Sequence, residues 1–224
     1  MTAAMVFAAG LGTRMRPLTD DRPKALVPVA GRALVDHALD QLAGAGPIVV
    51  NVHHHGEMIA AHLAGRDVHI QREAPAPLET GGGLRLALPV LGPKPVVTAN
   101  SDSVWTGPTL LETLQGAWNE AVMDVLLLLV PPARAVGTGG RRFALEADGR
   151  MRPDEGGLVA TGAAMMRTEG VAADPRATFS LLDHWMEAMR QDRLYGVEHP
   201  GAWADVGAPD RIAPAEAMLR AAAT

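Results

Sequence analysis

The chain has 224 residues, which suits one α/β domain or at most two small ones and is enough to bury about 70% of the unfolded surface. A formal net charge of −5 argues against nucleic-acid binding, which usually requires a basic face, and the lack of cysteine excludes disulfides and thiolate metal sites. No signal-like segment begins the chain, and its longest apolar run, Val125–Val130, is too short to span a bilayer, so we expect a cytoplasmic protein without a membrane partner.

The first predicted strand, Met5–Ala8, leads into a loop with two glycines. Gly10 and Gly12 have no Cβ, so this loop tolerates positive φ angles and the close approach of a ligand. Successive N–H groups in such a loop form an anion-binding nest. Residues 11–25 also carry four cations against two anions, namely Arg14, Arg16, Arg22 and Lys24 against Asp20 and Asp21. This local positive charge in an acidic chain predicts a polyphosphate site.

Two common phosphate-binding loops do not fit this segment. A dinucleotide fingerprint needs a third glycine where Met15 stands, and the P-loop pattern G-x-x-x-x-G-K-[ST] occurs nowhere. For a bare G-x-G, an ordinary glycine turn with solvated arginines would be the better interpretation. The length of the patterned segment argues against that alternative here.

The segment from Gly10 to Lys24 resembles the signature of the sugar-nucleotidyltransferase family, G-x-G-[TS]-R-x-x-P-L-T-x-x-x-P-K. The matching residues are Gly10, Gly12, Thr13, Arg14, Pro17, Leu18, Thr19, Pro23 and Lys24. The resemblance implies an enzyme that joins a nucleoside triphosphate to a sugar 1-phosphate and releases pyrophosphate. It implies catalytic roles for Lys24, on the phosphates of both substrates, and for Arg14, on the leaving pyrophosphate. The implied nucleotide-binding residues of this loop are Ala8, Ala9, Gly10, Gly12 and Thr13.

Short apolar runs and helical patterns alternate along the next hundred residues. Strands are predicted at Ile48–Val52, Val68–Gln71, Pro95–Ala99 and Asp124–Val130, and helices around 34–42 and at Glu57–Leu63, Leu84–Leu88 and Thr109–Trp118. This alternation predicts a Rossmann-like α/β fold, with a mostly parallel sheet and helices on both faces. Ligands of such sheets lie at the carboxyl ends of the strands.

The run His53-His54-His55 has the composition of a metal cluster. Neighbouring residues on a strand point to opposite faces, so three in a row do not converge on one ion. We expect a structural role at the end of the strand, with a metal site as the alternative.

A second candidate loop consists of Leu78, Glu79 and Thr80 followed by three glycines. The glycines would leave a bare surface for a base or a sugar, and a helix beginning at Leu84 would have its N-terminus near the ligand. A flexible hinge or helix start is the alternative. In the family this loop recognises the base, and this version resembles that of N-acetylmuramate 1-phosphate uridylyltransferases and their neighbours. The implied contacts are Glu79, Thr80, Gly81 and Gly82.

Two aspartates lie in the family's two metal motifs. Asp102 follows a predicted strand in Asn-Ser-Asp, with Ser101 in place of the family's glycine, and Asp205 lies in Trp-x-Asp-Val-Gly-x-Pro. A lone Asn-Ser-Asp after a strand is otherwise typical of a turn or a helix cap. The resemblance implies that both aspartates bind Mg²⁺, whose octahedral oxygen coordination suits two carboxylates with phosphate oxygens and water.

After residue 140 the pattern changes to a small antiparallel insertion, at about 138–168. It contains predicted strands Arg142–Glu146 and Leu158–Met166 around an Asp148-Gly149 turn, and helices at Phe179–Gln191 and Pro209–Ala222 follow. The resemblance implies a sugar side built from Gly139 or Gly140 and from Thr161 and Gly162. Asn100 is a further sugar candidate, with a turn role as its alternative. Asp154 or Glu155 occupies the place of a sugar-binding acid in relatives.

We therefore expect a single nucleotidyltransferase domain, 1–224, without the C-terminal β-helix domain of larger relatives, acting as a monomer or homodimer. The favoured substrates are UTP and N-acetylmuramate 1-phosphate, in cell-wall recycling. The near alternatives are a mannose or heptose 1-phosphate guanylyltransferase and a glucose 1-phosphate thymidylyltransferase. A non-catalytic nucleotide-sugar sensor is the alternative of another class, and the presence of Lys24 with both aspartates argues against it.

Overall fold

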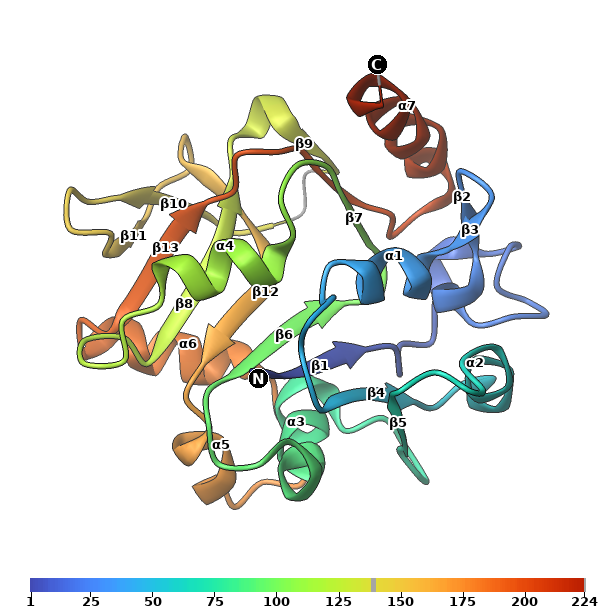
Figure 1. The fold of residues 1–224 in the computed structure, drawn as a ribbon, viewed down its shortest axis with the longest axis horizontal. Coiled ribbons are helices and arrows are strands. Elements are labelled where there is room, and N and C mark those ends of the chain that lie inside the picture. The colour runs from blue at the N-terminus through green and yellow to red at the C-terminus, as the bar shows by residue number, and fades with distance from the viewer. Residues whose placement is uncertain (138–139, 224) are drawn as a thin grey trace.

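A central β-sheet organises the computed structural model, which describes residues 1–137 and 140–223 (Figure 1). Within those residues the sheet has nine strands. Seven of these strands follow one another in the order β5 (His69–Arg72), β4 (Ile48–Val52), β1 (Ala3–Phe7), β6 (Val96–Asn100), β12 (Leu158–Met166), β8 (Val125–Val130) and β13 (Leu194–Glu198). The first four strands are mutually parallel, β13 is parallel to β8, and β12 runs antiparallel to both β6 and β8. The predicted, mostly parallel sheet is confirmed.

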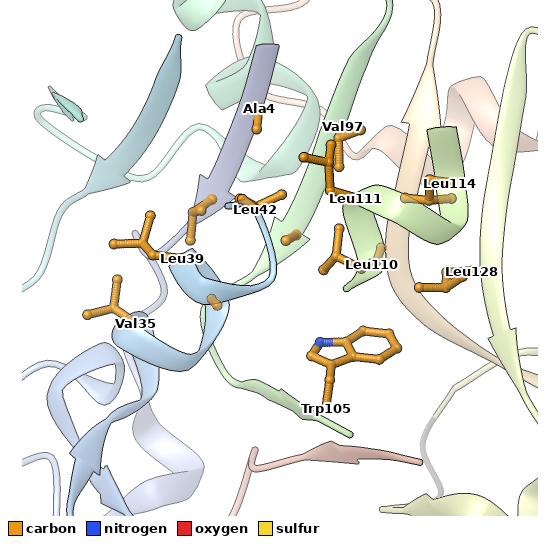
Figure 2. Close-up of a cluster of buried hydrophobic side chains, with 14 of the residues drawn as sticks. Ala4, Val35, Leu39, Leu42, Val97, Trp105, Leu110, Leu111, Leu114 and Leu128 are labelled. Carbon is orange, nitrogen blue, oxygen red and sulfur yellow. The ribbon is translucent and has the colours of Figure 1, made fainter. Parts of the chain in front are cut away.

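Helices cover both faces of this sheet and create two large apolar clusters. One cluster lies under α1 (Leu34–Asp40), α2 (Gly56–His62) and α4 (Leu110–Ala117). The other lies under α3 (Glu79–Leu91), α5 (Glu169–Ala173) and α6 (Leu181–Arg190). Successive strand residues alternate between the clusters, as Ala4 and Met5 do. Figure 2 shows side chains of the first cluster, among them Val35, Leu39, Val97, Trp105, Leu110, Leu111, Leu114 and Leu128.

The strands at the centre of the sheet are apolar throughout because both of their faces are covered. All six residues of β8, Val-Leu-Leu-Leu-Leu-Val, are buried. A continuous apolar run of this length is typical of a strand packed on two sides, and it explains why the sequence pattern located β8 so closely.

A second, small sheet joins distant parts of the chain beside the main one. It contains β7 (Ser103–Trp105), β14 (Trp203–Asp205) and β9 (Ala135–Val136), in the order β7-β14-β9. A third apolar cluster packs against it and includes Met15, Val27, Val104, Ala204 and Ala215. Ala215 lies on the last helix, α7 (Ile212–Ala222), so this cluster holds the C-terminal segment against residues 15–27.

The remaining elements outside the two larger sheets are a hairpin of two-residue strands and short 3₁₀ helices. The hairpin β2 (Pro28–Val29) and β3 (Arg32–Ala33) precedes α1, and the 3₁₀ helices are η1 (Thr13–Met15), η2 (Lys24–Leu26), η3 (Pro132–Arg134) and η4 (Pro209–Arg211). Among the helices of residues 1–137 and 140–223, none has the length and apolar character that crossing a membrane requires.

The antiparallel insertion is present, but its turn connects different strands from those expected. The Asp148-Gly149 turn joins β10 (Arg142–Leu145) to β11 (Met151–Pro153), not to Leu158–Met166. Gly149 has φ +86°, which favours glycine, and Asp148 Oδ1 accepts a bond from the N–H of Arg150 at 3.0 Å. The three-residue strand β11 was not predicted because it is short and contains a proline.

Candidate active site

A cavity of about 280 Å³ opens at the carboxyl ends of β1 and β6. Its walls come from the loop after β1, from η2, from the segment before α3 and from the end of β6. This is the edge at which α/β sheets bind their ligands. The lining residues are Phe7, Ala8, Ala9, Gly10, Lys24, Ala25, Asn51, Glu73, Pro77, Glu79, Thr80, Asn100, Ser101 and Asp102. The structure thus gathers in one cavity many of the residues that the sequence predicted.

Lys24 and Asp102 form an ion pair inside this cavity, with Lys24 Nζ donating to Asp102 Oδ2. Lys24 begins η2 directly after Pro23, while Asp102 lies between β6 and β7. The side chains of Lys24 and Asp102 are 18% and 15% exposed. The pair thus places one cation and one anion at the wall of the cavity, and their contacts with a ligand stay predictions.

Asp205 is brought to the same place by the pairing of β7 with β14. In that antiparallel pair Asp205 lies opposite Ser103, and the N–H of Val206 donates to the carbonyl of Asp102 at 2.8 Å. Asp205 Oδ2 in turn accepts a bond from the Arg211 guanidinium. Two carboxylates from distant parts of the chain thus become neighbours.

The charge on Asp205 is unfavourable in this setting. Burial raises the pKa of Asp205 above its ordinary value, and the neighbouring charge of Asp102 raises it further. Three cations oppose these effects and lower the same pKa: Arg211, Lys24 and Arg14. The site therefore holds two carboxylates and several cations, a suitable environment for a cation and a polyphosphate together.

The donor set fits Mg²⁺ better than a structural metal. Among residues 1–137 and 140–223 no group of three or more His, Cys, Asp or Glu side chains forms a metal site. Mg²⁺ is commonly held by only one or two carboxylates together with substrate phosphates and water. The pair Asp102 and Asp205 matches that arrangement, because a bound cation would relieve the repulsion between the two carboxylates.

The glycine loop presents Arg14 to this group of charges. Gly12 has φ +66°, and its carbonyl accepts a bond from the buried hydroxyl of Thr19 at 2.8 Å. This turn leads into η1, which contains Thr13 and Arg14. A Cβ on Gly207 would lie 2.9 Å from Asp205 Oδ1 and 3.2 Å from an Arg14 guanidinium nitrogen, so Arg14 lies beside Asp205. Gly12 and Thr13 shape the turn and lie outside the cavity lining.

The three glycines after Thr80 are closely packed, where an open surface was expected. They lie inside α3, which begins at Glu79 and not at Leu84. The N–H groups of Gly81 and Gly82 donate to the carbonyl of Phe179 at 2.8 and 3.2 Å, and a Cβ on Gly81 would lie 2.2 Å from the Phe179 ring. These two glycines therefore permit close contact with the segment before α6. Their contact with a nucleotide stays a prediction.

Glu79 and Thr80 begin this helix and do line the cavity. Glu79 has φ +59°, an uncommon angle for a residue with a Cβ. The hydroxyl of Thr80 accepts a bond from the N–H of Leu181 at 3.0 Å, so this side chain is anchored at the start of α6.

The predicted sugar side is only partly assembled at the cavity. Asn100 lines it, and Gly162 lies against Asn100, since a Cβ on Gly162 would be 2.5 Å from the Asn100 amide nitrogen. The Thr161 hydroxyl is buried and donates to the carbonyl of Leu128 at 2.8 Å, and Gly140 packs on the backbone of Ala160. Gly139 lies outside the described residues. Sugar contacts by these residues stay predictions.

Further candidates serve turns and strand ends. Asp154 Oδ1 accepts a bond from the N–H of Gly156 at 2.9 Å, which closes a turn, and the backbone carbonyl of Glu155 accepts from Arg142. His53 Nδ1 bonds to the carbonyl of Glu73 at 2.8 Å, and His55 has φ +51° before α2. These contacts hold His53 to the backbone that follows β5 and place His55 just before α2, and the role of the histidine run stays a prediction.

Sequence reasoning missed several residues of the site, and three of them are polar or charged side chains with defined partners: Asn51, Glu73 and Arg211. Asn51 and Glu73 line the cavity and are each 3% exposed, and Arg211 pairs with Asp205. Glu73 directly follows β5, so the rule that placed Asp102 at a strand's carboxyl end could have found it. Arg211 carried no such signal, because its contact depends on how η4 folds after Asp205.

Comparison with known proteins agrees with this geometry. The model of the MobA-like NTP transferase domain family matches residues 4–136. The chain is 43% identical to an N-acetylmuramate alpha-1-phosphate uridylyltransferase of Caulobacter vibrioides, over 96% of each chain. It is 36% identical to the protein of that name from Neisseria meningitidis serogroup B, over 97% of this chain and 98% of the relative. The resemblance to nucleotidyltransferases is thereby confirmed.

Solved structures support the fold. An inositol-1-phosphate CTP transferase from T. maritima superposes with a TM-score of 0.78 at 19% identity, over 98% of this chain and 96% of that one. A putative glucose-1-phosphate thymidylyltransferase from Bacillus anthracis gives 0.80 at 17% identity, with the same coverage. At such low identity these likenesses concern the fold alone, and they confirm its predicted class.

Proposed function

We propose that this chain, which belongs to the MobA-like NTP transferase family, transfers a uridylyl group from UTP to N-acetylmuramate α-1-phosphate and releases pyrophosphate. The observation that carries the proposal is the 43% identity to a uridylyltransferase of that specificity over 96% of both chains. The product is a UDP-sugar, and its role is in cell-wall recycling.

The reaction needs two anions to be held together while charge moves between them. The sugar-phosphate oxygen attacks the α-phosphorus in line, the bond from that phosphorus to pyrophosphate breaks, and no covalent enzyme intermediate is required. Positioning and charge stabilisation are then the main catalytic demands. Lys24 lines the cavity and would contact the reacting phosphates, while Arg14, at the Asp205 side, would hold the leaving pyrophosphate.

The proposed metal ligands are Asp102 and Asp205, which the β7–β14 pair holds together. Mg²⁺, when bound there, supplies positive charge that offsets the charge of the reacting phosphates. Lys24 pairs with Asp102 and Arg211 pairs with Asp205, so these two cations offset part of the charge of the carboxylates within the protein.

The remaining assignments follow the family resemblance, and of the residues concerned Ala8, Ala9, Gly10, Glu79, Thr80 and Asn100 line the cavity. The backbone of Ala8, Ala9 and Gly10, together with residues 79–82, would hold the base and ribose. A Cβ built on Gly10 would meet nothing within 4 Å, which leaves room for a ligand at that point. The sugar would be held by Asn100, Gly140, Thr161 and Gly162. The monomeric or homodimeric state and the cytoplasmic location remain predictions.

The experiment that tests the proposal is a pyrophosphate-release assay over a matrix of substrates. UTP, dTTP, GTP, CTP and ATP would each be combined with the 1-phosphates of N-acetylmuramate, N-acetylglucosamine, glucose and mannose, with Mg²⁺ present. We expect the highest kcat/KM for UTP with N-acetylmuramate 1-phosphate. Preference for GTP or dTTP would overturn the uridylyl assignment and leave the family intact. Tight triphosphate binding without turnover on any sugar would favour the sensor alternative.

A further inference from the structure

Two buried polar side chains connect the opposite walls of the cavity. Asn51, on β4, and Glu73, just after β5, are each 3% exposed. The N–H of Ala8 donates to Asn51 Oδ1 at 2.8 Å, and Asn51 Nδ2 donates to Glu73 Oε1 at 2.7 Å. The N–H of Leu78 donates to Glu73 Oε2 at 2.7 Å. The chain of bonds therefore runs from the loop after β1 to the residue before α3.

In each of these three hydrogen bonds the chemistry of the groups fixes which one donates and which one accepts. The backbone amides of Ala8 and Leu78 are donors only, so Asn51 must turn its oxygen towards Ala8 and its NH₂ towards Glu73. Glu73 then faces two donors and must accept with both of its oxygens. A carboxylate does so, whereas an amide would set its own NH₂ against a donor.

Joining the two loops through the buried carboxylate of Glu73 has a cost in folding free energy. No cation in residues 1–137 and 140–223 forms an ion pair with Glu73, and an unpaired buried charge costs stability. Glu73 also lines the cavity in which we propose that a polyanion binds. The two hydrogen bonds that Glu73 accepts offset part of this cost and fix the two loops relative to each other.

The first turn of α3 is packed directly on the pair. A Cβ on Gly83 would lie 2.6 Å from Glu73 Oε1 and 2.9 Å from the Asn51 amide nitrogen, so the helix approaches the two side chains without a side chain of its own. The position of Glu79 and Thr80 at the cavity therefore depends on the same pair that fixes Ala8.

We propose that Asn51 and Glu73 are positioning residues that set the distance between the two walls that hold the nucleotide, and so its affinity. The inference rests on the proposed function for the identity of the nucleotide. It assigns no contact between these side chains and the reacting atoms.

The test exchanges the amide and the carboxylate. Glu73→Gln alone places an NH₂ against a donor, and Asn51→Asp alone places two carboxylates face to face. In the double variant, the carboxylate at position 51 accepts from Ala8 and from the new amide at position 73, whose oxygen accepts from Leu78. All three bonds are restored with the same net charge. The three variants and the wild type would be compared in steady-state kinetics, calorimetric UTP binding and thermal unfolding.

We expect each single variant to raise the KM for UTP by about tenfold or more, since leaving a buried group unsatisfied costs that much in binding. The KM for the sugar 1-phosphate should change less than about threefold, and the double variant should recover most of the loss for UTP. Asp36→Asn is the matched control, because Asp36 is a buried carboxylate paired with His62 and Arg66 away from the cavity. That control should lower the melting temperature without raising the KM for UTP.

The proposal is overturned if the single variants leave the KM for UTP unchanged, if both KM values rise equally, or if the double variant is as impaired as the singles combined. If a single variant does not fold, the double variant decides the question. A folded double variant that binds UTP as the wild type does supports the proposal. A double variant that binds UTP weakly, or that does not fold, contradicts the proposal. The wild type tests the proposed function separately: if it prefers another triphosphate, the same comparison is made with that one.

Discussion

Asp205 lies beside Asp102 because β14 pairs with β7, which begins directly after Asp102: Ser103 is opposite Asp205, and the N–H of Val206 donates to the carbonyl of Asp102 at 2.8 Å. Backbone hydrogen bonds, which need no particular side chain, thus hold two like charges together. The raised pKa of Asp205 follows from this arrangement, through burial first and the charge of Asp102 second.

The first prediction concerns the metal ligands. Asp102→Asn and Asp205→Asn should each lower kcat at least about a hundredfold at saturating Mg²⁺, because the metal supplies several kcal/mol of charge stabilisation. Asp210→Asn, at an exposed acid in η4, is the control and should keep wild-type turnover. Near-normal turnover in both site variants would refute the shared Mg²⁺ site.

The second prediction concerns pH and stability without metal. Since the folded-state pKa of Asp205 is raised above 3.8, the native protein binds the proton more tightly than the unfolded chain. The contribution of Asp205 to stability therefore falls as pH rises from about 3.8 through the raised pKa. The free energy of unfolding of Asp205→Asn, relative to wild type, should increase across that window. Urea unfolding of both proteins at several pH values measures this difference in the free energy of unfolding. A difference that stays constant, or that changes in favour of the wild type as pH rises, would contradict a raised pKa of Asp205.

The third prediction separates catalysis from folding at Lys24. Lys24→Ala should lower kcat/KM by about a hundredfold or more, which is the usual effect of removing one preorganised hydrogen-bond donor from an enzyme active site. The melting temperature should change little, because Lys24 begins a short 3₁₀ turn and its side chain lies at the wall of the cavity. Lys94→Ala, at an exposed position, is the matched control. Lost stability with intact kcat/KM would assign Lys24 to the fold instead.

The fourth prediction concerns the close packing of α3. Gly81→Ala should destabilise the protein by about 1–3 kcal/mol, because its Cβ would overlap the ring and carbonyl of Phe179. Gly116→Ala is the opposite case: this glycine lies in α4 with nothing within 4 Å of an added Cβ, and the change should stabilise by up to about 1 kcal/mol. Urea unfolding of both variants gives the comparison. Equal effects of the two substitutions would show that packing on Phe179 does not constrain Gly81.

The sequence predicted best what is local. The strand–loop–cation segment from Met5 to Lys24 can be interpreted without knowing the fold, since the strand, turn and charges are contiguous. The apolar strands were located because burial on both faces leaves a continuous hydrophobic run, as in β8. The proximity of Asp102 and Asp205 was inferred from the family motifs, and the structure supplies its cause, the β7–β14 pair.

What the sequence could not predict depends on distant segments meeting. The glycines after Thr80 have the sequence pattern of an open surface, whereas in the structure Phe179 covers Gly81. Asn51 and Glu73 carry no pattern that predicts a shared hydrogen bond, because their contact arises from the parallel pairing of β4 with β5. The strand that follows the Asp148-Gly149 turn is also not predictable from the sequence, because β11 is too short to show an alternation of apolar and polar residues.

The identity of the transferred nucleotide is the central claim, and one competition measures it. The enzyme would be given UTP, dTTP, GTP, CTP and ATP at equal concentrations with N-acetylmuramate 1-phosphate and Mg²⁺, and each nucleotide-sugar product would be quantified by mass spectrometry at early times. A site that hydrogen-bonds uracil leaves buried groups unpaired with guanine, cytosine or adenine, so UDP-N-acetylmuramate should exceed those three products by about a hundredfold or more. Thymine offers the same hydrogen-bonding groups as uracil, so the UDP product should exceed the dTDP product by a smaller factor. A dominant GDP, dTDP, CDP or ADP product would contradict the account.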